Sequence, residues 1–328
     1  MQHLNFLKLV VGAGCAFLAV GCGIAGEKGT ALFTVGTAWD PHLPIAVGAK
    51  FDVVARKNDI TKAKLAVESA NPAVFVATGQ ADQFEAKGAG AGKFTALATD
   101  TKALIDQLEF TAAAPSKLEL SYWAERIVDG QASLPETFSL VAGSKLTLRA
   151  ELTDSGGRLL NHMGLVKSES AATPVLSVAS PTGVGHDCVA VAAGASKLTV
   201  SASQAVARSY QVSVVAANAV ADFDLAASPV VLNLGGVDKG NATTPPASEE
   251  GAAATTTVYF ALIRAKDANG GKVFGAAGKW SVAEAGVQLV AFSQGVSEVQ
   301  YLELKKGQKA TLHVEISGKS KEIVVIGQ

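Results

Sequence analysis

One pattern of segments occurs three times along this chain, with its segments in the same order and its copies spaced by about 100 residues. A period of that length is too long for a solenoid unit, which spans roughly 20–50 residues, and it fits a folded domain. Each copy contains a strand-like segment, a shorter apolar segment, a hairpin-like segment after a glycine turn and a closing apolar run. In the order of the three copies, these are 45–55, 140–150 and 257–265; 64–69, 165–170 and 279–284; 90–96, 194–200 and 307–314; and 107–110, 211–215 and 322–326.

The repeated segments alternate apolar with polar or small residues, as in Leu146, Leu148, Ala150 and Leu152. A period of two is typical of half-buried strands, and helical spacing is scarce after the first 21 residues. Short strands with hairpin turns predict an all-β chain of three β-sandwiches. We expect the divisions 1–21 (signal peptide), 22–30 (tether), 31–113, 114–217 and 218–328, with a flexible insertion at 238–256 that is rich in Ala, Thr, Pro and Glu.

The third copy carries a resemblance to a known family. Residues 261–273, followed by Lys279-Trp280-Ser281-Val282, resemble the bacterial Ig-like domains that occur in tandem in invasin- and intimin-type surface proteins. The resemblance implies Ig-like sandwiches, a place for Trp280 in the core of the third one, and a role in adhesion. The first two copies match less closely and have no tryptophan at that place.

The N-terminus has the pattern of an export signal, because an uncharged run at 9–20 follows Lys8 and ends in small residues. Ala19-Val20-Gly21-Cys22 resembles the lipobox of bacterial lipoproteins, which are cut before the cysteine that then carries lipid. Ala19 stands where leucine is usual, and the same residues would suit ordinary signal-peptidase cleavage and free secretion. Lipidation of Cys22 would anchor the protein to a membrane, and by the same resemblance Gly23 favours the outer membrane, on its periplasmic or surface face.

Charge and cysteine content narrow the function further. Removing residues 1–21 removes only Lys8, which leaves 28 − 1 = 27 basic against 29 acidic residues and no basic face for nucleic acid. Cleavage also removes Cys15, and lipidation would occupy Cys22. Cys188 then has no disulfide partner, so we expect it to be a small buried side chain.

Three clusters are candidate chemical sites. His186-Asp187-Cys188 would be the candidate centre of a hydrolase, but adjacent strand residues point to opposite faces. Asp222, Asp224, Asp267 and Asn269 could supply oxygen ligands to calcium, although Asp267 and Asn269 are also turn formers. Gly88 to Lys93 lacks the Ser or Thr and the helix of a phosphate-binding loop. We therefore expect no enzyme, no bound metal and no cofactor other than the N-terminal lipid.

Trp39, Tyr122 and Trp123 are the candidate ligand-contact aromatics, since exposed rings can stack on sugars or anchor a protein. Packing within the sandwiches is the favoured interpretation of all three. The sequence thus predicts a lipid-anchored envelope or cell-surface protein that acts as a non-enzymatic adhesive, spacer or assembly component, with a surface protein or polysaccharide as partner. A carbohydrate-binding accessory lipoprotein is the alternative, followed by a hydrolase.

Overall fold

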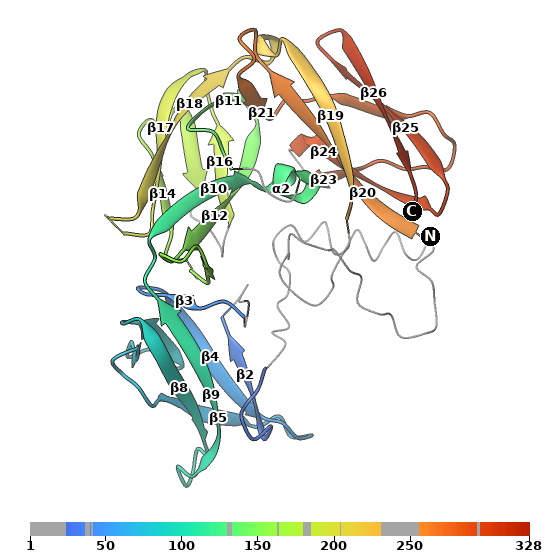
Figure 1. Cartoon of the computed structure of the whole chain (residues 1–328). Helices are drawn as coiled ribbons and strands as arrows, with labels where there is room; N and C mark the ends of the chain where they lie inside the picture. The colour runs from blue at the N-terminus through green and yellow to red at the C-terminus, as the bar shows by residue number, and fades with distance from the viewer. Residues whose placement is uncertain are drawn as a thin grey trace.

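The structure, a computed structural model, describes residues 24–36, 40, 42–129, 133–162, 164–179, 185–203, 205–230, 256–293 and 296–328. These residues form three β-sandwiches in chain order, which confirms the predicted all-β fold of tandem Ig-like domains (Figure 1). The third sandwich lies beside the second instead of extending the line from the first, so the molecule is bent (Figure 1). Within the described ranges, we find no helix with the length and apolar character needed to cross a membrane.

The first sandwich packs two layers around a cluster of phenylalanines. One layer has the order β1-β2-β4-β7-β6 and the other β3-β9-β8-β5, and a short β4–β5 contact joins them. Phe33, Phe75 and Phe94 are fully buried between the layers. The strands are β1 (Ile24–Ala25), β2 (Ala31–Val35), β3 (Ile45–Ala46), β4 (Lys50–Lys57), β5 (Lys64–Ser69), β6 (Phe75–Ala77), β7 (Gln83–Ala86), β8 (Gly90–Leu97) and β9 (Leu104–Ala113).

The second sandwich repeats this plan, with layers β10-β12-β16-β15 and β14-β17-β18-β11. The alternation in β12 places Leu146, Leu148, Ala150 and Leu152 inside, as predicted. In both sandwiches a parallel strand covers the last strand: β3 pairs with β9, and β11 pairs with β18. The elements are β10 (Lys117–Tyr122), α2 (Trp123–Asp129), β11 (Thr137–Val141), β12 (Lys145–Thr153), β13 (Leu159–Leu160), β14 (Lys167–Ser170), β15 (Leu176–Ala179), β16 (Gly185–Ala190), β17 (Gly194–Ser201) and β18 (Ala207–Val215).

The third sandwich has layers β19-β20-β24-β23 and β22-β25-β26. Trp280 of β22 is partly buried and packs against the two apolar clusters of this sandwich. The predicted insertion 238–256 lies outside the described residues up to Thr256, which begins β20. The elements are η1 (Ala217–Ala219), β19 (Asp222–Val230), β20 (Thr256–Lys266), β21 (Lys272–Phe274), β22 (Lys279–Val282), β23 (Val290–Ser293), β24 (Val296–Lys305), β25 (Lys309–Ile316) and β26 (Lys319–Ile326).

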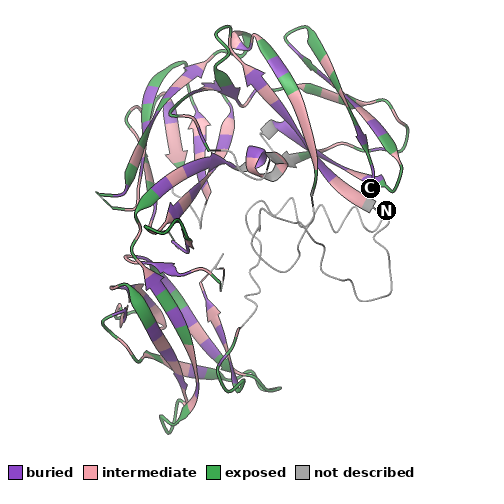
Figure 2. Ribbon diagram, in the orientation of Figure 1, coloured by how far each residue is buried: buried purple, intermediate pink, exposed green. Residues whose placement is uncertain are grey.

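Neighbouring sandwiches are joined by one recurring device. After the Asp/Gly turn that ends β12 or β20, the chain pairs in parallel with the β3 or β11 strand of the preceding sandwich. Asn161, next to β13, bridges to Ile45, and β21 pairs with β11. In the first sandwich the corresponding residues 58–63 form a shorter turn without a strand. Burial continues across both joints, where purple segments of adjoining sandwiches meet (Figure 2).

Candidate functional site

Of the three aromatic residues predicted as ligand contacts, the structure describes the side chain of one, Tyr122. Cys22 and Trp39 lie outside the described residues, and Trp123 begins α2 with a side chain that is likewise outside them. Tyr122 ends β10 and is only 3 % exposed. Its hydroxyl donates a hydrogen bond to Glu298, and its ring lies 5.1 Å from that of Phe274, both in the third sandwich. Tyr122 therefore joins two sandwiches and is not open to a ligand on a surface.

The His186-Asp187-Cys188 cluster lies on β16 and splits between the two faces of the strand. His186 and Cys188 point into the core. Asp187 points outward, where it accepts a hydrogen bond from the Thr147 hydroxyl at 2.7 Å and forms an ion pair with Lys145 at 2.8 Å. Burial, together with the charge of Asp187, raises the pKa of Cys188 to about 12. Burial also lowers the pKa of His186 to about 4. At neutral pH the cluster therefore offers a thiol in place of a thiolate, which does not suit nucleophilic catalysis.

Cys188 should be unreactive in the native protein. A chain that starts at residue 24 has it as the only cysteine, so alkylation by iodoacetamide at pH 8 reports on this thiol alone. We expect native labelling to be at least roughly 100-fold slower than labelling in denaturant, because reaction needs the exposed thiolate. Native and denatured rates within a few-fold of each other would contradict this placement.

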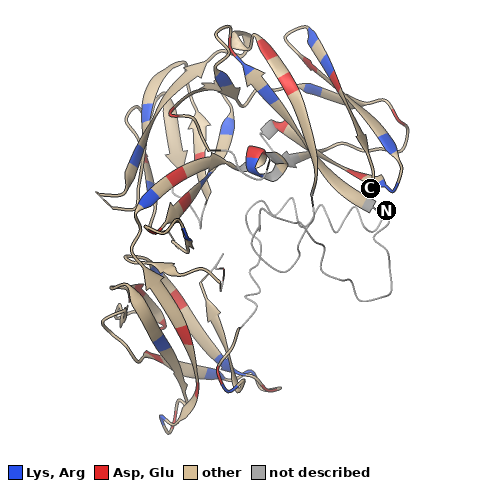
Figure 3. Ribbon diagram, in the orientation of Figure 1, with Lys and Arg blue, Asp and Glu red and all other residues tan. Residues whose placement is uncertain are grey.

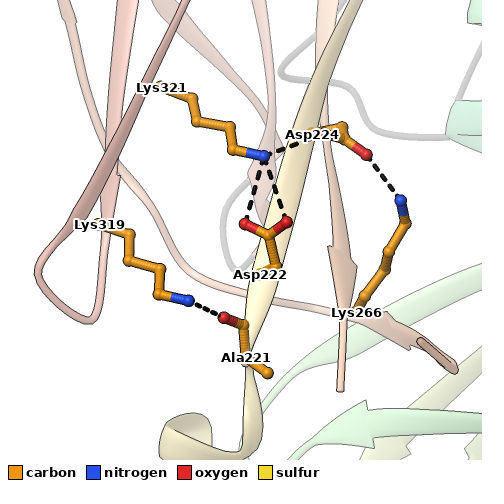
Figure 4. Close-up of polar contacts among 6 residues, drawn as sticks. All are labelled: Ala221, Asp222, Asp224, Lys266, Lys319 and Lys321. Atoms are coloured by element: carbon orange, nitrogen blue, oxygen red, sulfur yellow. Dashed lines mark hydrogen bonds and ion pairs between the residues drawn. The ribbon is translucent and has the colours of Figure 1, made fainter. Parts of the chain in front are cut away.

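The acidic residues considered for calcium are held by lysines. On β19, Asp222 and Asp224 face Lys321 of β26 at 3.2 Å and 3.0 Å, and Asp224 also pairs with Lys266 at 2.7 Å (Figure 4). Asp267 instead accepts hydrogen bonds from the backbone N–H groups of its own turn. In the part of the chain that the structure describes, no group of three or more His, Cys, Asp or Glu side chains could hold a metal ion.

Lys319 and Lys321 lie on β26, the last strand of the third sandwich, whose counterparts β9 and β18 each pair with a parallel strand. Lys321 reaches from β26 to β19, and Lys319 donates to the carbonyl oxygen of Ala221 (Figure 4). Among the described residues, β26 pairs only with β25. Exposed ion pairs of this kind contribute little to stability because solvent screens them, so they hold the two layers together only weakly. Elsewhere, basic and acidic residues are interspersed over all three sandwiches (Figure 3).

The joint between the first and second sandwiches is built around one buried asparagine. The Nδ2 group of Asn161 donates to the carbonyl oxygens of Asp40 and Leu43, each at 2.8 Å, and its Oδ1 accepts from the backbone N–H of Asp40 at 3.1 Å. Its own backbone exchanges hydrogen bonds with Pro44 and Ala46 at 2.8 Å. Because Asn161 is only 6 % exposed, these bonds satisfy a buried amide and fix the two sandwiches against each other.

The joint between the second and third sandwiches combines aromatic packing with buried acids. Phe274 of β21 packs edge-on against Tyr122 and Phe138 of the second sandwich. Buried Glu125 of α2 pairs with Lys272 at 3.0 Å. Gly275, which follows β21, has a φ of 76°, and a Cβ there would lie 2.2 Å from the Ser144 hydroxyl oxygen, so a side chain is excluded at this contact.

Glu298 of β24 is the central acid of this second joint. It is 1 % exposed, and its carboxylate accepts hydrogen bonds from Tyr122 and from the backbone N–H of Gly275, the latter at 2.5 Å. Burial raises the pKa of Glu298 to about 7, although these two hydrogen bonds oppose the rise. Burial also raises the pKa of Tyr122, which keeps its hydroxyl as a donor.

The chain next to the candidate lipidation residue is folded onto the first sandwich. β1 pairs with β2, and Asp106 of β9 accepts hydrogen bonds from the backbone N–H groups of Lys28, Thr30 and Ala31 at 2.8–2.9 Å. Residues 24–30, expected to belong to a tether, are therefore part of the sandwich. These residues are held by the carboxylate of Asp106, which is 75 or more positions away in the chain. A local sequence pattern does not reveal so distant a hydrogen-bond partner. Residues 1–23 lie outside the described chain, and Cys22 stands two positions before its first residue, Ile24.

Comparisons with known proteins found similar solved structures only. No protein-family model matches the chain, and no curated protein matches it either. Among solved structures, domains 4–9 of the surface layer protein SbsC align with 84 % of this chain at 18 % identity and a TM-score of 0.36. This chain spans 42 % of that one. The Escherichia coli adhesin FdeC aligns at 15 % identity over 93 % of this chain and 98 % of its own, with a TM-score of 0.25. Invasin, a bacterial integrin-binding protein, aligns at 11 % identity over 90 % of this chain and 60 % of its own, with a TM-score of 0.23.

Proposed function

We propose that this protein is a lipid-anchored, non-enzymatic envelope or cell-surface protein whose three Ig-like sandwiches act as a shaped spacer that presents a binding surface. The observation that carries the proposal is the pair of domain joints, in which strand pairing and buried polar groups hold each sandwich against the next. At the first joint, the buried and satisfied amide of Asn161 specifies one geometry, because another arrangement would leave this buried amide without its partners. A defined shape suits a protein that positions a partner.

The proposed anchor lies very close to the folded chain. If Cys22 carries the lipid, only residue 23 separates it from Ile24, and extended chain spans roughly 3.3–3.6 Å per residue. The first sandwich would then lie within about 10 Å of the bilayer surface, whereas a free tether over 22–30 would let it move out to roughly 30 Å. We place the domains at 24–113, 114–217 and 218–328, the membrane as the outer one, and the partner as a surface protein or polysaccharide.

Metabolic labelling tests the anchor. Cells that express the full chain are fed a radioactive or clickable palmitate, and the intact mass of the purified protein is measured. We expect label in the wild type, none in Cys22→Ala, and full label in the matched control Cys188→Ala, since Cys188 is buried in the second sandwich. An unlabelled wild type that is released into the medium would reject the anchor and leave a secreted protein.

A further inference from the structure

The groups that bond to the Glu298 carboxylate come from two different sandwiches. Its own strand, β24, belongs to the third sandwich, and so does Gly275, whose backbone N–H bonds one carboxylate oxygen. The hydroxyl bonded to the other oxygen belongs to Tyr122 of the second sandwich. Both donors are neutral. The carboxylate is therefore buried by the contact between the sandwiches without a cation bonded to it in the described residues.

The charged groups around this carboxylate come from every element packed at the joint. Glu125 of α2 adds negative charge, which Lys272 of β21 partly offsets through its ion pair at 3.0 Å. Arg264 and Lys266 of β20 and Asp224 of β19 line a cleft of about 300 Å³ together with Tyr122, Glu125 and Lys272. Glu298 itself does not line this cleft, and Lys266 there pairs with Asp224 at 2.7 Å. Placing a negative charge on Glu298 thus costs free energy while the joint is closed.

The backbone part of this joint is small. Only two residue pairs, Ser139–Val273 and Leu140–Phe274, connect β11 to β21. The ring of Phe274 adds contacts with Tyr122 and Phe138. The helix α2 also packs on β19 and β20 of the third sandwich. Separating all of these contacts exposes Glu298 to water, where its carboxylate is solvated. Opening of the joint and ionisation of Glu298 are therefore coupled.

We propose that Glu298 makes the joint between the second and third sandwiches proton-controlled, closed when its carboxyl group is protonated and loosened when the proton leaves for solvent. The closed joint raises the pKa of Glu298 from its ordinary 4.5 to about 7. A raised carboxyl pKa favours the closed state fully below pH 4.5, and this advantage is lost as the pH rises to about 7. The opening equilibrium should increase by about 300-fold across that range, which corresponds to the difference between the two pKa values.

Hydrogen exchange measured by mass spectrometry on the full mature chain tests this proposal. Protection factors, corrected for intrinsic exchange, are followed from pH 4.5 to 8 in peptides covering β10, β21 and β24. We expect protection at the joint to fall by at least ten-fold in the wild type, while the cores of the first and second sandwiches stay unchanged. Glu298→Gln should abolish this pH dependence, because an amide does not ionise. The matched control Glu303→Gln, on the same strand and with no contact to Tyr122, should retain it.

A second variant keeps the proposal open to rejection if Glu298→Gln fails to fold. Tyr122→Phe removes the hydroxyl that stabilises the ionised carboxylate, so the pH at which protection falls should rise. Wild-type protection that does not vary with pH, or a pH dependence retained in Glu298→Gln, would overturn the proposal. So would a Tyr122→Phe midpoint that stays the same or moves to lower pH. None of these outcomes depends on whether Cys22 is lipidated.

Discussion

Replacing Asp106 with alanine should destabilise the first sandwich by about 3–5 kcal/mol, because the change leaves one buried and three part-buried N–H groups without their acceptor. The carboxylate is fully buried and accepts from Lys28, Thr30, Ala31 and Gln107. Losing it frees the turn that holds β1 against β2. Urea titration with hydrogen exchange of peptides from residues 31–113 measures the loss in the intact chain.

The control for this change is Asp52→Ala, an exposed carboxylate on β4, which should change stability by less than about 0.5 kcal/mol. Gly26→Ala offers an independent test, since a Cβ there would lie 2.4 Å from the carboxyl carbon of Asp106. It should weaken the same turn. If Asp106→Ala costs no more than Asp52→Ala, the turn is held by something other than this carboxylate.

The pH dependence of the first sandwich follows from the same contacts. Burial raises the pKa of Asp106, but the hydrogen bonds it accepts outweigh burial and lower the pKa from 3.8 to about 2. A depressed carboxyl pKa stabilises the fold above pH 4, and this contribution, about 2 kcal/mol, is lost as the pH falls towards 2. In the joint, Glu298 has the opposite sign, so acid weakens the first sandwich while it tightens the contact between the second and third.

The part of the fold that follows from the sequence is the part fixed by local patterns. Period-two alternation identifies which side chains of β12 are inside, because neighbouring strand residues always face opposite ways. The recurrence of that pattern about every 100 residues gives three sandwiches. The burial of Cys188 beside an outward Asp187 follows in the same way.

The joints did not follow from the sequence, because their partners are far apart in the chain. Asn161 bonds to residues 118 and 121 positions away, and Tyr122 bonds to Glu298 across 176 positions. The copies carry one signal that could have located them: residues 155–164 and 268–278 extend the turn after the first repeated strand, whereas 58–63 is short. Asp106 is a second such signal. It is a charged residue at a position of β9 whose alternation with Phe110 and Ala112 places it on the buried face.

Replacing Phe94 with alanine should cost the first sandwich about 3–5 kcal/mol, because the phenylalanine ring is the centre of its core. Phe94 has no exposed surface, and its ring centroid lies 4.7 Å from that of Phe84, 5.1 Å from Phe75, 5.3 Å from Phe110 and 6.2 Å from Phe51. Truncation leaves a cavity and removes four ring contacts at once. Small domains have a total stability of about 5–15 kcal/mol, so this one loss should bring the sandwich close to unfolding.

The control for Phe94→Ala is Leu104→Ala, because Leu104 lies in the neighbouring strand β9 and is 48 % exposed. It should cost less than about 1 kcal/mol, while Phe94→Leu, which keeps most of the volume, should fall between the two. Calorimetry of the full chain should show an early transition only in Phe94→Ala, with the transition of the third sandwich in place. Equal losses for Phe94→Ala and Leu104→Ala would mean that the first sandwich is held by its joint to the second and not by its own core, and the bent array would then unfold as one unit.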